Sequence, residues 1–212
     1  MQQLIQQRNT TWQLLNRAKT LYNTWADIQS RSLSTLQSIC NIVAQRKCTL
    51  ELPKTVERYN IDQSKLLFKQ TNSISSLIEK QRVLLGLFED VCSRWSELRR
   101  DVDKFVTKVL QQQQHTTTPL PLSTESMLQV AAVNVSDLYE MVLLLDYSYH
   151  QEYIYKTSLF GQLQSSLSEP TDAYHLLELW QEESHVDKKT LEDMFERMKM
   201  FTTIKKVLES VN

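Results

Sequence analysis

The sequence predicts an all-α protein: an elongated helical bundle or coiled coil of three long helices followed by two shorter C-terminal helices. The chain has 212 residues but only 2 Gly and 4 Pro, so tight turns are few and helices can run far before they end. Apolar residues make up 41% of the chain, which is enough for a core. In several long stretches they recur at steps of three and four, which places them on one face of a helix.

The first long helix is expected over residues 2–46, where apolar residues form one broad stripe. The stripe weakens from Asp27 to Ser32, which indicates a kink or an exposed segment there. Pro53 and the alternation of polar and apolar residues from Thr49 to Leu52 then predict an extended connection over residues 47–60.

The central helix has the clearest pattern in the chain. From Leu67 to Val109 the steps of three and four never break, and this period of about 3.5 residues is typical of a helix seam packed in coiled-coil fashion. A helix of this length, roughly 65 Å, cannot bury its seam alone, so the rest of the chain or another chain must cover it. The main seam and interface candidates are Leu77, Leu84, Phe88, Val91, Trp95, Leu98, Val102 and Phe105.

Two glutamines, Gln70 and Gln81, also occupy seam positions. Polar seam residues often fix register and partner choice at a cost in stability. The alternative is that both lie where the seam reaches solvent, and the sequence leaves the two interpretations open.

The chain is expected to have three parts. Residues 1–110 form an antiparallel hairpin of the first two helices. Residues 111–126, rich in Gln, Thr and Pro, form a polar linker. Residues 127–212 form a C-terminal helical part that packs on the hairpin or on a partner.

Within this C-terminal part, the apolar segment Met127–Val133 is either a docked strand-like piece or a helical turn. The third long helix begins near Asn134, whose side chain suits an N-cap, and it ends at Ser168–Pro170. A short amphipathic helix follows from Ala173 to about Glu183. The last helix starts after Asp187, a second N-cap candidate, and its Met and Phe content suits either a core or a binding groove.

Many of the tyrosines fall in the third helix. They point in several directions around it, so one core cannot hold all of them. Tyrosine brings a large apolar body and a polar tip, which favours an interface with another protein. The alternative is a wide bundle core with tyrosines at its edge. The residues concerned are Tyr139, Tyr147, Tyr149, Tyr153 and Tyr155.

Charge and cysteine usage argue against several classes of function. The net charge is −1, so the whole chain has no electrostatic reason to bind nucleic acid or a membrane surface. The longest apolar run, Met141 to Leu145, is far too short to span a bilayer, and the polar N-terminus does not resemble a signal peptide. The 3 Cys lack CxxC spacing, which favours reduced thiols in an intracellular protein over disulfides or a zinc site.

No catalytic constellation is visible in the sequence. There is no Gly-rich phosphate loop, and the 4 His are scattered. His175 and Glu178 share a helix face, but no second motif supports a metal site. We therefore expect no catalytic residue, no cofactor and no metal, and a binding or scaffolding role.

Several local patterns together match one family. From Asn134 to Phe160, residues stand at the family's spacing without a gap, and shorter matches occur in the first two helices. The matching residues are Val135, Asp137, Glu140, Tyr149, Tyr153 and Leu159 in the third helix, Leu128–Gln129 before it, Lys69–Gln70, Glu79–Lys80, Leu85 and Val91 in the central helix, and Trp12–Gln13 in the first. Over roughly residues 5–163 the chain resembles the AIRIM family, small helical ribosome-maturation factors that partner AAA+ ATPases of the spermatogenesis-associated group.

Two features depart from that pattern. Family members carry basic residues around the paired tyrosines, whereas the run from Tyr149 to Tyr153 contains no Lys or Arg, so a partner contact through that face must differ here. The stretch from Trp180 to Met194 looks more like CINP, the small cyclin-dependent-kinase-interacting protein. CINP is the companion of AIRIM proteins in the same assembly, which makes it the rival identity for this chain.

The resemblance implies a non-enzymatic adaptor subunit within a hetero-oligomer. It would pair with a CINP-like chain through long helices and dock on an AAA+ ATPase of the spermatogenesis-associated group. That assembly is associated with maturation of the large ribosomal subunit and with extraction of proteins from chromatin during replication, in nucleus and cytoplasm. No direct nucleic-acid or membrane contact is expected. The partner-facing candidates are Asp137, Glu140, Tyr149 and Tyr153.

The alternative function is that of a structural coiled-coil subunit in another multiprotein assembly, such as a tether, a kinetochore or a cytoskeletal complex. The unbroken seam favours this function equally well.

Overall fold

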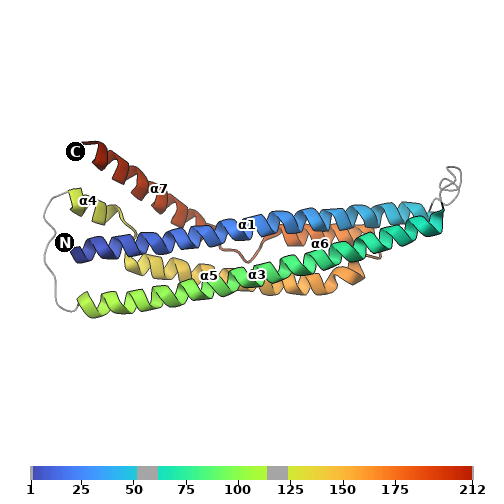
Figure 1. Cartoon of the computed structure of the whole chain (residues 1–212), viewed down its shortest axis with the longest axis horizontal. Helices are drawn as coiled ribbons and strands as arrows, with labels where there is room; N and C mark the ends of the chain where they lie inside the picture. The colour runs from blue at the N-terminus through green and yellow to red at the C-terminus, as the bar shows by residue number, and fades with distance from the viewer. Residues whose placement is uncertain (1, 52–61, 114–123, 212) are drawn as a thin grey trace. The chain divides into compact units, whose positions relative to one another are not determined.

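A computed structural model describes residues 2–51, 62–113 and 124–211, and all regular structure in these ranges is α-helical (Figure 1). Three helices are long: α1 (Gln2–Glu51), α3 (Gln63–Gln113) and α5 (Val135–Ser166). Two shorter helices follow, α6 (Pro170–Glu182) and α7 (Lys188–Val211), and the short helix α4 (Thr124–Ala131) precedes α5. The predicted all-α fold of three long and two shorter C-terminal helices is confirmed, with α4 in addition.

The chain folds into two compact units, and the long helices contribute to both. Unit 1 consists of Met1–Asn23, Cys92–His150 and His185–Asn212, so it holds α4 and α7. Unit 2 consists of Thr24–Val91 and Gln151–Ser184, so it holds α6. Within each unit, segments of α1, α3 and α5 that are far apart in sequence lie side by side (Figure 1).

The core of unit 2 forms where three helices bring aromatic side chains together. Trp25 of α1 and Phe88 of α3 are both buried, with ring centroids 4.4 Å apart. Trp180 of α6 is buried as well. These residues lie on the apolar stripes that the sequence periodicity predicts, so their burial removes the stripes of several helices from water at once.

A lysine and a glutamate lie inside this core. Lys156 and Glu152 of α5 both have 0% of their side chains exposed, and Lys156 Nζ lies 3.1 Å from Glu152 Oε1. Nζ also donates to the backbone oxygen of Trp180 at 2.9 Å and lies over the rings of Trp180 and Phe88. Burial lowers the pKa of Lys156 below its usual value, and the attraction of Glu152 and Glu183 offsets only part of this effect.

Helix α6 is fixed to α1 near both of its ends. Near its start, Cys40 Sγ of α1 donates to the Ala173 carbonyl of α6 at 3.3 Å. At its end, Gln29 Nε2 donates to the Trp180 carbonyl at 2.9 Å, and Trp25 Nε1 donates to Glu183 Oε1 at 2.6 Å. Glu183 ends the helix in the left-handed conformation, with φ 48°. The carbonyls that a helix end leaves open are thus partly satisfied by side chains of other helices.

The two seam glutamines make buried polar contacts between α1 and α3. Gln81 is fully buried, and its Nε2 donates to Ser32 Oγ at 2.6 Å. Gln70 is buried too, with Nε2 3.5 Å from Thr49 Oγ1. The interpretation that these glutamines lie where the seam reaches solvent is therefore wrong. Their pairing with α1 favours a role in fixing the register of the two helices.

Aromatic pairs build the core of unit 1. Trp95 of α3 stacks on Tyr149 of α5, with ring centroids 5.2 Å apart and ring planes 15° apart. Helix α7 adds Phe201, which packs on Trp12 of α1 at 5.1 Å, and Met194, which is fully buried. Of the two roles that the Met and Phe content of α7 allows, these side chains fill the core.

Helices α5 and α7 begin at side-chain caps. Asn134 Oδ1 accepts the Asp137 N–H at 2.7 Å at the start of α5. Asp187 Oδ1 accepts the Thr190 N–H at 3.0 Å at the start of α7. Both N-caps expected from the sequence are confirmed, and each satisfies a backbone donor that the first helical turn leaves open.

We expect Asp187→Ala to lower the free energy of unfolding by about 1 kcal/mol at pH 7, because the Thr190 N–H and hydroxyl both lose their acceptor. The same hydrogen bonds lower the pKa of Asp187 below its usual 3.8. Its stabilisation is therefore present above pH 3.8 and is lost as the pH falls through the lower folded-state pKa. Urea unfolding over this acid range should show the two proteins converging; a constant difference would contradict an ionised cap.

Two details of the connections differ from the sequence expectations. Helix α1 continues to Glu51, so the extended conformation predicted from residue 47 onward is wrong for residues 47–51; residues 52–61 lie outside the described ranges. The helix continues because Thr49 is buried against Gln70 and donates to the Gln45 carbonyl at 2.9 Å. Met127 belongs to helix α4, so the strand-like alternative is wrong.

Helix α1 is also continuous through the segment from Asp27 to Ser32, where the apolar stripe weakens. Ile28, Gln29 and Ser32 are buried, whereas Asp27, Ser30 and Arg31 are exposed, so one face of this segment lies in the core. Of the predicted polar linker, residues 111–113 belong to α3 and residues 124–126 to α4. Residues 114–123 lie outside the described part of the chain.

Among the described residues, the stretch Met127–Ser166 has the length and apolar content of a membrane-crossing helix. A helix in a protein core can have the same composition. Here Leu138, Val142 and Leu145 are buried in unit 1, and the buried charge of Lys156 is paired within unit 2. Core packing thus accounts for one face of α5, while other apolar residues of the helix, such as Leu144 and Ile154, stay exposed.

Candidate interaction surface on α5

Helix α5 presents two different apolar faces in unit 1. The inward face consists of Leu138, Val142, Leu145 and Tyr149, all fully buried against the other helices of the unit. These residues follow one another at steps of four, three and four, which is the spacing of one helix face. The inward face therefore belongs to the core.

The outward face is apolar as well. Tyr139, Leu144 and Tyr147 expose 36%, 41% and 65% of their surface, and Leu143 is half-buried between them. We call these four residues the outer stripe. Their spacing keeps them on one side of α5. Large apolar side chains that stay exposed together mark protein interaction sites, and tyrosine is enriched in such sites.

Glu140 lies within the outer stripe, and it is exposed. Residues 135–150 contain three acidic residues and no Lys or Arg. Asp137 and Asp146 are paired with arginines of neighbouring helices. Glu140, in contrast, makes no ion pair with any described residue, so the outer stripe carries one uncompensated negative charge.

Asp137, a predicted partner-facing residue, is used inside unit 1. Its carboxylate accepts a hydrogen bond from Arg197 of α7, and the same guanidinium also binds Asp193 at 3.0 Å. The two carboxylates raise the pKa of Arg197 above its usual value, with Asp193 making the larger contribution. Asp137 thus joins the start of α5 to α7, and its charge is compensated within the chain.

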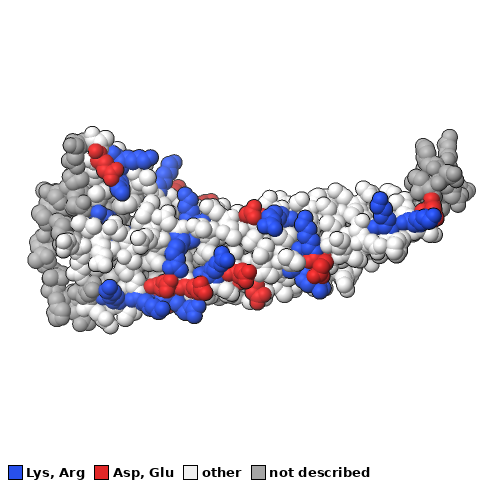
Figure 2. Space-filling view, in the orientation of Figure 1, with Lys and Arg blue, Asp and Glu red and all other residues white. Residues whose placement is uncertain are grey.

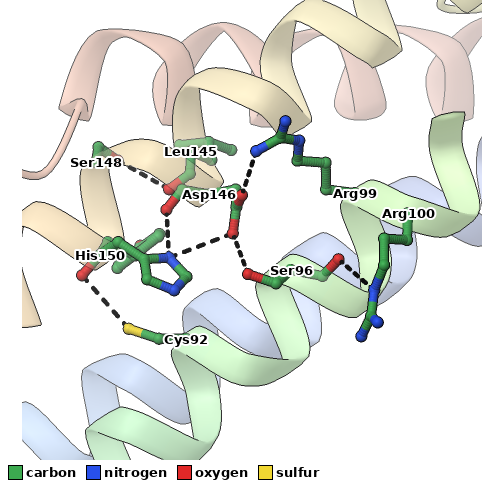
Figure 3. Close-up of polar contacts among 9 residues, drawn as sticks. Cys92, Ser96, Arg99, Arg100, Leu145, Asp146, Ser148 and His150 are labelled. Atoms are coloured by element: carbon green, nitrogen blue, oxygen red, sulfur yellow. Dashed lines mark hydrogen bonds and ion pairs between the residues drawn. The ribbon is translucent and has the colours of Figure 1, made fainter.

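Asp146 is the centre of a polar cluster between α3 and α5 (Figure 3). Its nearly buried carboxylate accepts hydrogen bonds from Ser96 Oγ at 3.1 Å and Arg99 at 3.3 Å. His150 Nδ1 lies 3.3 Å from the same carboxylate and 2.9 Å from the Asp146 backbone oxygen. Arg100 donates to the Ser96 carbonyl at 3.4 Å. None of these residues was among the predicted site residues, although an acid directly after the apolar run from Met141 was a sequence signal for the cluster.

A cleft of about 510 Å³ opens beside this cluster. Arginine, histidine, serine and carboxylate side chains line it together, so it has no excess of one charge. Of its three acids, Asp146 is already bound by Ser96 and Arg99. The cluster therefore holds α5 on α3.

The two predicted tyrosines have different positions. Tyr149 lies in the core of unit 1, stacked on Trp95, and its backbone oxygen accepts from Cys92 Sγ at 3.5 Å. It is therefore not available on the surface for a partner. Tyr153 lies in unit 2 and is half-buried. The exposed tyrosines of the outer stripe are Tyr139 and Tyr147, which the sequence analysis noted but did not select.

The predicted seam of α3 is covered within the chain. Leu77 and Phe105 are half-buried, and the six other candidates are fully or nearly fully buried: Leu84, Phe88, Val91, Trp95, Leu98 and Val102. A partner cannot reach these side chains while the units are folded. The pairing with another chain that was predicted through this seam would have to use other surfaces.

Charged side chains do not form a field of one sign on the face that Figure 2 shows. Basic and acidic residues are interspersed there. Several exposed charges are paired within the chain, as Arg17 is with Asp101 at 2.8 Å. Such exposed pairs contribute little to stability. Among the described residues, no group of three or more His, Cys, Asp or Glu side chains is placed to hold a metal ion. Burial raises the pKa of the Cys40 thiol to about 11, which keeps it protonated at neutral pH.

Comparison with known proteins identifies one family. The family model described as ribosome biogenesis protein C1orf109-like matches residues 6–202. This match includes the outer stripe, the α3 seam, and the stretch from Trp180 to Met194 that looks like CINP. A comparison with individually curated proteins gave no match. Since the family model covers nearly the whole chain, this protein belongs to the C1orf109-like family of ribosome biogenesis proteins, which is the AIRIM family.

Proposed function

We propose that this chain is a non-enzymatic adaptor subunit of a complex built around an AAA+ ATPase of the spermatogenesis-associated group. The complex would act in maturation of the large ribosomal subunit and in extraction of proteins from chromatin during replication, in nucleus and cytoplasm. Membership in a family of ribosome biogenesis proteins supports the first of these processes. The observation that carries the adaptor role is the outer stripe, an apolar surface that the folded chain leaves open.

In this proposal the chain pairs with a CINP-like helical protein to form a hetero-oligomer, and it contacts neither nucleic acid nor membrane directly. Its long helices would provide the scaffold, because the α3 seam holds them together from inside. The outward faces of these helices would then be available to bind partner proteins. Tyr147, the most exposed residue of the outer stripe, would be part of such a contact.

Affinity purification of the tagged full-length chain from its own cells, followed by mass spectrometry, tests this function. The wild type is expected to recover an AAA+ ATPase together with a second small helical protein. The double variant Leu144→Asp/Tyr147→Asp should lose most of both. Val83→Asp is a matched control, because Val83 is an exposed apolar residue of a long helix outside the outer stripe.

The same experiment decides against the proposal in two ways. If the wild type recovers no ATPase, the adaptor function is wrong. If it recovers other coiled-coil proteins in place of the ATPase, the chain is a structural subunit of another assembly, as its helices of 50 and 51 residues would also allow.

A further inference from the structure

We propose that the outer stripe binds an amphipathic helix of a different protein, and that this helix carries a Lys or Arg in its apolar face opposite Glu140. This inference rests on the proposed function only in that the chain has a protein partner, and it specifies the chemistry of that partner's binding segment. A second copy of this chain does not meet the requirement.

The shape of the surface favours a helix as the bound element. From Tyr139 to Tyr147 the outer stripe extends along about 12 Å of a regular helix. Its side chains form a row along the helix, in which Leu143 is less exposed than the neighbouring Leu144 and Tyr147. Rows of this kind pack into the grooves of a second helix. Tyr139 and Tyr147 stand at the two ends of the stripe, where an aromatic ring can cover apolar surface while its hydroxyl stays in water.

The charge of the surface selects the partner. Glu140 lies near the middle of the stripe on the helix circumference, between Tyr139 and Leu144. A partner that covers the stripe also desolvates this carboxylate, which is costly unless a cation compensates it. A lysine or arginine within the partner's apolar face supplies that cation, and such a pair would also fix the register of the two helices.

The arginines that bind the two other acids of this α5 segment are already engaged. Arg197 is bound by Asp137 and Asp193, and Arg99 is bound by Asp146. Moving either arginine to Glu140 would leave an acid of unit 1 without its partner.

Self-association fails for the same reason. The α5 segment from residue 135 to 150 contains no Lys or Arg. Two outer stripes packed on one another would bring Glu140 of each copy into the interface, with no cation from either stripe. Like charges buried together destabilise an interface. The surface is thus built for a partner of opposite charge.

Site-specific photocrosslinking in cells tests the inference with the full-length chain. A photoreactive amino acid replaces Tyr147, and mass spectrometry identifies the crosslinked segment. We expect a helical segment of another protein with apolar residues at steps of three and four and a Lys or Arg among them. A crosslink to a second copy of this chain, to nucleic acid or lipid, or to a segment without a cation would overturn the proposal, as would the absence of any crosslink.

A charge exchange supplies the second readout. Glu140→Lys should weaken recovery of the crosslinked protein by about tenfold, and changing the partner's cation to Glu should restore it. Glu89→Lys is the matched control, because Glu89 is an exposed glutamate on α3. Circular dichroism checks that each variant keeps its helicity. If the wild type and Glu140→Lys recover equal amounts of the crosslinked protein, the charge of Glu140 does not contribute to binding, which would contradict the proposal.

The two proposals fail independently. Recovery of an AAA+ ATPase without a basic helix at Tyr147 would leave the adaptor function standing and refute the assigned surface. A basic helix crosslinked at position 147 in the absence of any ATPase would support the assigned surface and refute the adaptor function.

Discussion

Replacing Glu152 by alanine is expected to lower the free energy of unfolding of unit 2 by about 3–5 kcal/mol. The substitution leaves the Lys156 ammonium in the core without the carboxylate that lies 3.1 Å away. Three compensations remain: the Trp180 carbonyl, the faces of two aromatic rings and the attraction of Glu183. None of them replaces the paired carboxylate, and burial already lowers the pKa of Lys156. Chemical denaturation monitored by circular dichroism measures the loss.

A double variant that removes both charges distinguishes the cost of an unpaired buried charge from the loss of side-chain packing. Lys156→Met with Glu152→Leu fills similar volume without a charge, and this double variant should be more stable than either Lys156→Ala or Glu152→Ala alone. Gln29 still caps α6 through the Trp180 carbonyl in the double variant. If each single variant lost less than about 1 kcal/mol, the pair would have to be solvated, which would contradict its complete burial.

Alanine substitutions at two tyrosines only two positions apart on α5 are expected to change stability by very different amounts. Tyr149→Ala should lower the free energy of unfolding of unit 1 by about 3–5 kcal/mol, the range for large aromatic core residues, because it removes the ring stacked on Trp95. Tyr147→Ala should change stability by no more than about 0.5 kcal/mol, since 65% of its surface is exposed.

The comparison also tests the orientation of α5. Thermal unfolding of the two variants gives the stability difference, and the crosslinked partner of Tyr147 gives a binding readout. We expect Tyr147→Ala to reduce partner recovery without a change in melting temperature. A strong loss of stability in Tyr147→Ala would place this side chain in the core and remove the outer stripe.

The helices could be predicted from the sequence because their periodicity is long and unbroken. The α3 seam from Leu84 to Val102 is buried as the spacing requires, and the caps at Asn134 and Asp187 have the side chains that a helix start selects. These features depend on residues close together in the chain. The end of α1 was missed because Thr49 is held by Gln70, a contact that local propensity does not contain.

The faces of α5 could not be assigned in the same way. Tyr147 and Tyr149 point about 200° apart on a helix, and both residues are equally suited to a core or to an interface. Which one is buried depends on where Trp95 of α3 lies, and this depends on the register between two helices. Likewise, the local sequence could not show that the charges of Glu152 and Lys156 would be paired in the core.

The contact between Gln29 and the Trp180 carbonyl has a consequence for synthesis of the chain. The two residues are 151 positions apart, so at about 5–20 residues per second the ribosome needs roughly 8–30 s to make the second after the first. During that interval Gln29, Trp25 and Phe88 have been made, but the tryptophan that completes their core has not. The growing chain must therefore hold apolar helix faces in water until α6 emerges, which makes the nascent form of unit 2 the state most dependent on chaperones.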